Sequence, residues 1–206
     1  LGHRDGNVIV VSNKIESAAD LKGKTFAIPS NQSSHNILLS DMLDTAGLTR
    51  EDINIIQLTP AEMPSSLAGK AIDGYCVAEP FGAQAVVNEI GHVLYKSEEL
   101  WENSICCALV LRDDFISAHA EEVELLAEYY NKAGDALTDE KKLDIAEQYL
   151  GQDKKVLSES LAWISFDNLA IETADYDLLA EKVISNGILE NPPAYEDFVW
   201  KNGDTQ

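Results

Sequence analysis

The sequence is short of basic residues and has no long hydrophobic run. It holds 15 lysines and arginines against 36 aspartates and glutamates, so its formal net charge is −21. Such a chain repels phosphates and offers no basic patch, which excludes nucleic acid as a partner. No apolar run approaches the roughly 18 residues that a membrane-spanning helix requires, and we expect no signal peptide at Leu1.

Cysteine is scarce, with only Cys76, Cys106 and Cys107 in the chain. An odd number that includes an adjacent pair does not make a disulfide framework. Apolar residues follow Cys76 and Cys107, which predicts thiols buried in strands. An adjacent cysteine pair is also a candidate for a soft metal ion. No histidine or third cysteine stands at ligand spacing, so we expect neither a metal nor a cofactor.

Familiar catalytic motifs are missing as well. The sequence contains no GxSxG, P-loop, HExxH or GxGxxG pattern. Its four histidines are scattered without partners at suggestive spacing. We therefore predict no catalytic residue and expect a protein that is not an enzyme.

Apolar segments of strand length alternate with helical patterns in the N-terminal half. At 45% hydrophobic residues, the chain can support a core. Capping signals mark several helix ends: Thr59, Pro60 and Glu62 form a capping box, while Gly47 and Gly69 are stop signals. The alternation predicts an α/β fold with parallel strands buried on both faces. The predicted strands cover residues 7–12, 25–30, 53–58, 72–78 and 92–96.

The C-terminal half is mainly helical. Residues 105–112, ICCALVLR, are predicted to form one more strand, and amphipathic helices follow it. Helices of this kind need a sheet or each other to bury their apolar stripes. We therefore expect a second sheet, with its missing strands upstream of Leu1.

The stretch IPSNQSSHNILL, residues 28–39, changes from a strand pattern to a helix pattern across a polar turn. Serine and asparagine are common helix caps, which is one interpretation of this turn. Free amides and a positive helix end also make an anion site. Ligands of α/β sheets bind beyond the carboxyl ends of strands. Asn31, Ser33, Ser34 and His35 are therefore candidate ligand residues.

A second polar loop follows the strand predicted over residues 72–78. Glu79 stands directly after it, where it either stabilises the next helix or faces a cleft. A carboxylate about 4 Å from nitrate or sulfate would cost roughly 4 kcal/mol. If Glu79 faces a ligand, that ligand should carry a donor end. Tyr75 is a weaker candidate for ring stacking, because strand aromatics usually belong to the core.

Four stretches in this order resemble the solute-binding proteins of ABC importers. They are DLKGKTFAIPSNQSSHNILL, AGLTREDINIIQL, TPAEMPSSLAGKAIDGYCVAEPF and ICCALVLRDDFI. More narrowly, the chain is similar to the group that binds nitrate, sulfonate, taurine, bicarbonate and thiamin-pyrimidine precursors. The resemblance runs from about residue 7 to about residue 133 and more loosely to the end.

This resemblance implies a two-lobed periplasmic-binding-protein fold of type II that closes about a hinge on its ligand. Residues 25–92 would form the second α/β lobe. Residues 1–24 and 93–206 would form the remaining part of the first lobe, with hinge strands and C-terminal helices, and the N-terminal part of that lobe would be missing. Hinge segments line the cleft, so Asn103 and Ser104 are further candidate ligand residues, while Trp101 is equally suited to packing.

The resemblance also implies a function, namely capture of a small anionic or zwitterionic solute for an ABC importer. Sulfonates including taurine, nitrate and pyrimidine precursors are the candidate solutes. We expect a small-molecule ligand, a membrane permease as partner and a monomer at full length. The protein would lie outside the cytoplasm, in the periplasm or as a lipoprotein at the cell surface. Two alternatives stay open: a pyrimidine-synthase-like enzyme of the same fold, and the effector-binding domain of a LysR-type regulator.

Overall fold

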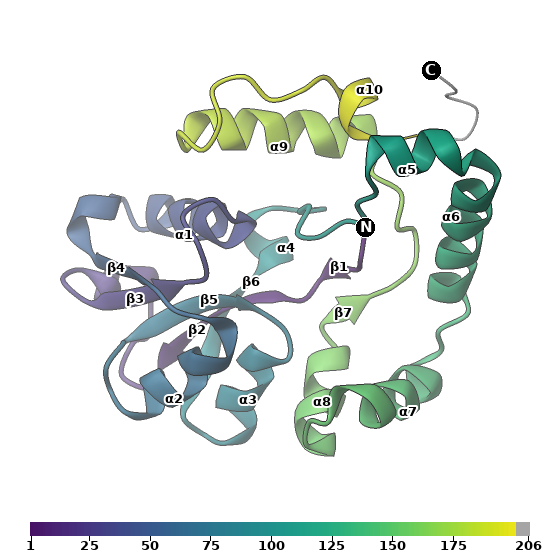
Figure 1. Ribbon diagram of the computed structural model, residues 1–206. Coiled ribbons are helices and arrows are strands. Elements are labelled where there is room, and N and C mark those ends of the chain that lie inside the picture. Colours follow the sequence, from purple (N-terminus) through teal and green to yellow (C-terminus); the bar gives the residue numbers. More distant parts are fainter. Residues whose placement is uncertain (201–206) are drawn as a thin grey trace.

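A five-stranded sheet forms the centre of the computed structural model, which describes residues 1–200. The strand order is β4-β3-β5-β2-β6 (Figure 1). All five strands fall at predicted positions, because each is an apolar segment of strand length. Their bounds are Asn7–Ser12 for β2, Thr25–Ile28 for β3, Asn54–Gln57 for β4, Gly74–Ala78 for β5 and Gly91–Lys96 for β6.

The sheet is mixed, so the prediction of parallel strands throughout is wrong. Strand β3 runs parallel to β4 and β5 as expected, but β2 is antiparallel to both β5 and β6. A strand that is buried on both faces is apolar whichever way it runs, so the sequence did not reveal the direction of β2. The sheet also extends beyond residues 25–92 on both sides, through β2 and most of β6. The division into lobes at these residues stays a prediction.

Helices cover both faces of the sheet. Helix α1 (Ser34–Thr45) lies on one face, and α2 (Met63–Ala68) and α3 (Phe81–Val87) lie on the other (Figure 1). Alternate residues of β2 supply the two cores: Ile9 packs in the cluster with α1, and Val8 packs in the cluster with α2. This arrangement follows from the two-residue side-chain period of a strand. Strand β2 is consequently buried along almost its whole length.

Three short 3-10 segments connect these elements: η1 (Ala18–Leu21), η2 (Arg50–Asp52) and η3 (Pro60–Glu62). The predicted capping box is present at η3, where the Glu62 carboxylate accepts the Thr59 N–H at 3.0 Å. Gly47 follows α1 with φ +65°, a conformation that favours glycine at a helix end. These local signals were therefore read correctly from the sequence.

The rest of the chain forms a curved arm of helices beside the sheet (Figure 1). A two-stranded ladder of β1 (Arg4–Asp5) and β7 (Ile164–Ser165) lies between the arm and the sheet. Within residues 1–200, no helix combines the length and apolarity needed to cross a bilayer. The remaining helices are α4 (Ser97–Leu100), α5 (Asp113–Ala118), α6 (Ala120–Asp135), α7 (Asp139–Leu150), α8 (Lys154–Leu161), α9 (Thr173–Ser185) and α10 (Tyr195–Phe198).

The strand predicted over residues 105–112 is wrong. This segment forms no ladder with any other residue in the part of the chain that the structure describes. Two of its apolar side chains are open to solvent, with Leu109 46% and Val110 83% exposed. A strand needs a neighbour for its backbone groups, and the apolar pattern predicts burial without supplying that neighbour.

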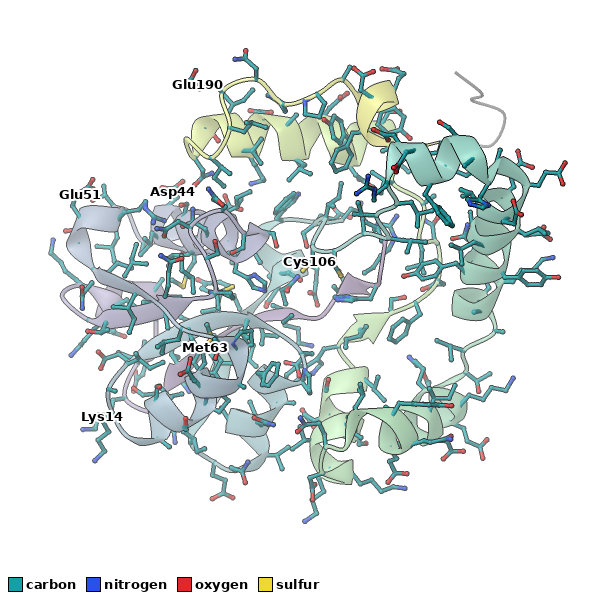
Figure 2. The ribbon with its side chains drawn as sticks, in the orientation of Figure 1. Lys14, Asp44, Glu51, Met63, Cys106 and Glu190 are labelled. Atoms are coloured by element: carbon teal, nitrogen blue, oxygen red, sulfur yellow. The ribbon has the colours of Figure 1, made fainter. Side chains whose placement is uncertain are left out.

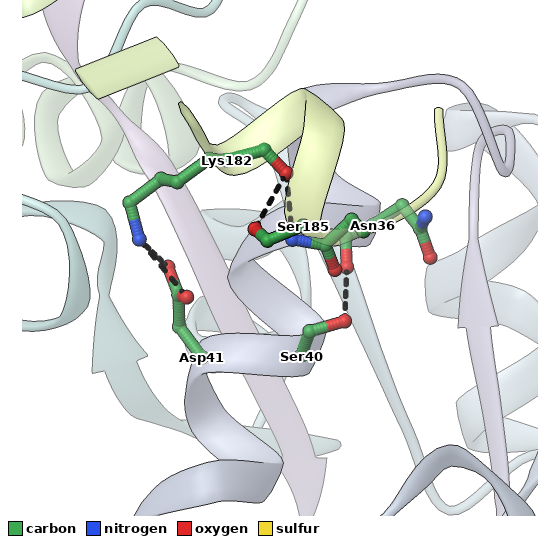
Figure 3. A network of polar contacts seen from close by, with 6 residues as sticks. Asn36, Ser40, Asp41, Lys182 and Ser185 are labelled. Atoms are coloured by element: carbon green, nitrogen blue, oxygen red, sulfur yellow. Dashed lines mark hydrogen bonds and ion pairs between the residues drawn. The ribbon is translucent and has the colours of Figure 1, made fainter. Parts of the chain in front are cut away.

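Helix α9 is joined to α1 by an ion pair between Lys182 and Asp41 (Figure 3). The Lys182 ammonium lies 2.9 and 3.0 Å from the two carboxylate oxygens of Asp41. Both side chains are less than a fifth exposed, and the ammonium also lies 5.3 Å from the centre of the Trp101 ring. The arm therefore contacts the same helix that begins at the polar turn of residues 30–33.

Candidate functional site

The strand directions bring the predicted ligand loops to one edge of the sheet. Strands β3 and β5 are parallel, so their carboxyl ends meet at this edge, and the antiparallel β2 begins there. Asn7 pairs with Ala78 at the end of β5, and the Glu79 N–H donates to the Gly6 carbonyl at 2.8 Å. Asn7 is thus part of this edge, although no sequence pattern selects it.

Hydroxyl and amide side chains fix the shape of the turn before α1. The Ser33 hydroxyl donates to the Ser30 carbonyl at 2.8 Å, and the Ser30 hydroxyl accepts the Gln32 N–H at 3.1 Å. The Asn36 side-chain amide donates to the Asn31 carbonyl at 2.8 Å. Because the Ser33 hydroxyl is used within the turn, it makes no capping hydrogen bond to α1. The Asn36 N–H donates to the Ser33 carbonyl at 3.0 Å, which leaves the N–H groups of Ser34 and His35 open to another acceptor.

Several buried polar side chains of β2, α1 and the segment after α4 lack hydrogen-bond partners within residues 1–200. They are Asn7 through Nδ2, His35 through both ring nitrogens, Ser104 through Oγ and Trp101 through Nε1. Burial lowers the pKa of His35 to about 4, so its ring is neutral at physiological pH. Unpartnered buried groups cost about 1–3 kcal/mol each. A polar solute that supplied their hydrogen bonds would recover much of that cost.

Cys106 connects three parts of the site. Its thiol donates to Asn7 Oδ1 at 3.3 Å and is also hydrogen-bonded to the Ser34 side chain. Figure 2 shows Cys106 between the ribbons of α1 and β1, and its side chain is half-buried. The hydrogen bond with Cys107, and then burial, raise the pKa of the Cys106 thiol. The same hydrogen bond lowers the pKa of Cys107 to about 6. Residues from β2, α1 and the 105–112 segment therefore converge here.

The Glu79 carboxylate points away from this group of residues. Both of its oxygens lie 3.2 Å from the Ala83 amide nitrogen at the start of α3, and it is hydrogen-bonded to the Ser160 side chain of α8. Glu79 continues the face of β5 that carries Tyr75 and packs against α2 and α3. Burial raises the pKa of Glu79 to about 7. The structure thus places Glu79 against a helix end, and a ligand contact stays a prediction.

The other candidates are divided between interior and surface. Ser104 is buried, whereas Asn31 and Asn103 are exposed, and Asn103 has φ +56°. Tyr75 is fully buried and its hydroxyl donates to the Phe81 carbonyl at 2.9 Å, so it belongs to the core.

A hollow of about 470 Å³ lies between α1 and α9, near the contacts of Figure 3. Polar and charged residues of both helices line it, Asp44 and Lys182 among them. None of the predicted ligand residues lines this hollow. It is therefore separate from the group of residues around Cys106.

The chain resembles known proteins along most of its length. The model of the NMT1-like family matches residues 3–151. The ligand-binding component of an ABC-type import system from Staphylococcus aureus, solved with zinc bound, is 30% identical with a TM-score of 0.90. That match covers 97% of this chain and 70% of the S. aureus chain.

A second solved structure is the periplasmic aliphatic sulphonate binding protein SsuA from Escherichia coli. It is 20% identical with a TM-score of 0.78, and the match covers 98% of this chain and 67% of SsuA. The desulfurization enzyme DSZB is a more distant neighbour, 12% identical with a TM-score of 0.59; the match covers 95% of this chain and 74% of DSZB. At these identities the likeness concerns the fold alone.

Among curated relatives, the nitrate import ATP-binding protein NrtC of Synechocystis is 29% identical over 131 residues. The match covers 56% of this chain and 20% of NrtC, so the chain spans about a fifth of that relative. The expected periplasmic-binding-protein fold and the resemblance to solute-binding proteins of ABC importers are both confirmed. The family match covers well over half of the chain, which therefore belongs to the NMT1-like family.

Proposed function

We propose that this chain captures a small anionic or zwitterionic solute for an ABC importer. The observation that carries the proposal is the uncapped start of α1 beside buried polar side chains without partners, namely Asn7, His35 and Ser104. The S. aureus relative, a ligand-binding component of an ABC-type import system, supports a binding role over catalysis.

The chemistry of these groups favours an oxyanion. Open helix N–H groups and the Asn7 Nδ2 are donors only, and the positive end of the helix dipole adds to them. A neutral His35 donates through one ring nitrogen, and the Ser104 hydroxyl can donate as well. Donors thus outnumber acceptors around the turn. Sulfonate, nitrate and carboxylate groups match such a set, and SsuA and NrtC carry sulphonate and nitrate in their names.

Glu79 has a different part in this proposal. Its carboxyl group already holds the start of α3, so it acts on the solute only if that contact opens. A solute with an amino group, such as taurine or an aminopyrimidine, would benefit from such a change. Simple oxyanions do not need it. The ratio of the affinities for amino-bearing solutes and for simple oxyanions therefore reports whether Glu79 contacts the solute.

Solute capture would work by closure about the hinge. A solute held by the turn and by Ser104 joins the start of α1 to the chain just before residues 105–112, and its extra contacts favour the closed form. The closed protein would dock on a membrane permease. This scheme requires a location outside the cytoplasm, in the periplasm or on a lipid anchor, and a monomer at full length.

The test is calorimetry with the protein and a set of solutes: alkanesulfonates, taurine, nitrate, bicarbonate and pyrimidine precursors. For the best binder, Ser34→Ala should weaken binding by about 1–2 kcal/mol, since one hydrogen bond is lost. The melting temperature of the unbound protein should hardly change, because Ser34 is only half-buried. Ser185→Ala on α9 is the matched control and should bind normally. Equal affinity of Ser34→Ala and the native protein would remove the turn from the site.

A further inference from the structure

We propose that His3, Cys106 and Cys107 bind a soft divalent metal ion such as Zn²⁺. One ligand atom from each residue lies within 4.8 Å of the other two, although His3 is about a hundred positions away in sequence. The fold therefore supplies the histidine that sequence spacing failed to reveal. The contacts that indicate this metal site do not depend on the proposed solute capture, although Cys106 belongs to both groups of residues.

The distances fit a tetrahedral ion after a small adjustment. Zinc binds cysteine sulfur at about 2.3 Å and histidine nitrogen at about 2.0–2.1 Å, which sets neighbouring ligand atoms roughly 3.5–3.8 Å apart. Separations of at most 4.8 Å thus need to shorten by about 1 Å. Rotation of exposed or half-buried side chains can supply that movement without a change of backbone.

His3 is already oriented as a ligand. Its Nδ1 lies 2.9 Å from the Asp5 carbonyl oxygen. A carbonyl oxygen only accepts, so Nδ1 carries the proton and Nε2 has a free lone pair. Metal-binding histidines characteristically donate their other N–H to a carbonyl or carboxylate, which fixes the tautomer and the ring.

The backbone holds the cysteines beside His3. The Gly2 N–H donates to the Cys107 carbonyl at 2.9 Å, so the two segments run side by side. A Cβ atom on Gly2 would lie 2.9 Å from Cys107 Sγ, and glycine therefore leaves room for the sulfur. On the other side, Asn7 Oδ1 accepts from the Cys106 thiol at 3.3 Å. Both sulfur atoms thus lie close to the His3 ring, and a backbone hydrogen bond holds their segment in place.

The donor set selects the class of metal. Two thiolates and an imidazole suit zinc and other soft ions, and they do not suit magnesium or calcium, which prefer oxygen. Three protein ligands leave a fourth position for water or an external ligand. Cys107 is exposed, and His3 and Cys106 are half-buried, so an ion can enter from solvent.

The first experiment titrates the reduced full chain with Co²⁺ and follows its absorption, then displaces it with Zn²⁺. Thiolate ligation should give an intense near-ultraviolet charge-transfer band, and tetrahedral geometry should give strong visible bands. Zinc should abolish both at one equivalent, and excess Mg²⁺ should not. A cobalt complex without the thiolate band, or cysteines that oxidise without retaining metal, would overturn the proposal.

Variants assign the ligands. Cys106→Ser, Cys107→Ser and His3→Gln each remove a ligand and should weaken zinc binding by more than the roughly tenfold to hundredfold that loss of an outer-shell partner costs, measured by competition with a chromogenic chelator. Cys76→Ala and His119→Gln are the matched controls, since these residues lie outside the cluster, and both should keep native affinity. Circular dichroism checks that each variant folds. Where a variant does not fold, the cobalt spectrum of the native protein decides whether thiolates bind the metal. Native affinity in the folded double variant Cys106→Ser/Cys107→Ser would exclude the site.

Discussion

Replacement of Glu79 by glutamine should change the pH dependence of stability. Burial raises the pKa of Glu79 from its ordinary 4.5 to about 7, so the folded protein holds this proton more tightly than the unfolded chain does. The stabilisation from Glu79 is complete below about pH 4.5 and is lost as the pH rises through about 7. Glutamine stays neutral throughout and keeps an oxygen to accept the Ala83 N–H.

The magnitude follows from the two pKa values. One pH unit between the folded and the unfolded pKa corresponds to about 1.4 kcal/mol, so charging the buried carboxylate costs about 3 kcal/mol above pH 7. The free energy of unfolding of Glu79→Gln, relative to that of the native protein, should accordingly increase as the pH rises. Relative to their difference at pH 4, the variant should be more stable by up to about 3 kcal/mol at pH 8.

The assay is urea unfolding of both proteins at a series of pH values between 4 and 8, with the difference in free energy of unfolding plotted against pH. Taking this difference removes the contributions of all other titrating groups. Glu124→Gln, an exposed position on α6, is the matched control and should give a flat difference. A flat difference for Glu79→Gln as well would refute the buried carboxyl and would place Glu79 in a solvated position.

Two further predictions concern the arm and the 105–112 segment. Lys182→Met should destabilise the protein by roughly 1–3 kcal/mol in urea unfolding, because it leaves a largely buried Asp41 unpaired; Lys132→Met, which breaks an exposed pair with Glu128, should cost less than about 1 kcal/mol. Leu109 and Val110 are exposed apolar side chains, so the 206-residue chain should self-associate or bind a hydrophobic dye. The double variant Leu109→Ser/Val110→Ser should reduce both effects. A monomer that binds no dye at any protein concentration would contradict this prediction.

The positions of strands were readable from sequence, whereas their directions and neighbours were not. Apolar runs located the five strands of the central sheet, because burial leaves a local signature, but not the two-residue strands β1 and β7. Which segments become neighbours determines the antiparallel course of β2. It also determines that residues 105–112 join no sheet within residues 1–200, and no local pattern encodes that choice. Only the structure could therefore show which strands pair with one another.

In the candidate site, too, the features that are local in sequence could be predicted, and those that depend on distant contacts could not. The turn before α1 was identified because a strand end, small polar residues and a helix start are consecutive in sequence. The orientation of Glu79 follows from strand alternation with Tyr75, but only the fold shows that this face packs on α3. Asn7 and His3 were missed, because each acquires its role through contact with the distant cysteine pair.

Cys106 stands in both the proposed metal site and the group of solute residues, which predicts that the two are coupled. A metal-bound cysteine is a thiolate, so zinc would remove the proton that now bonds to Asn7 Oδ1. Asn7 would then be free to reorient, and the affinity for solute should change by several-fold. Thermodynamic linkage requires the solute to change zinc affinity by the same factor, and calorimetry in both directions measures the two factors. The coupling should disappear in Cys106→Ser. A factor of one in the native protein would show that Asn7 does not transmit between the sites.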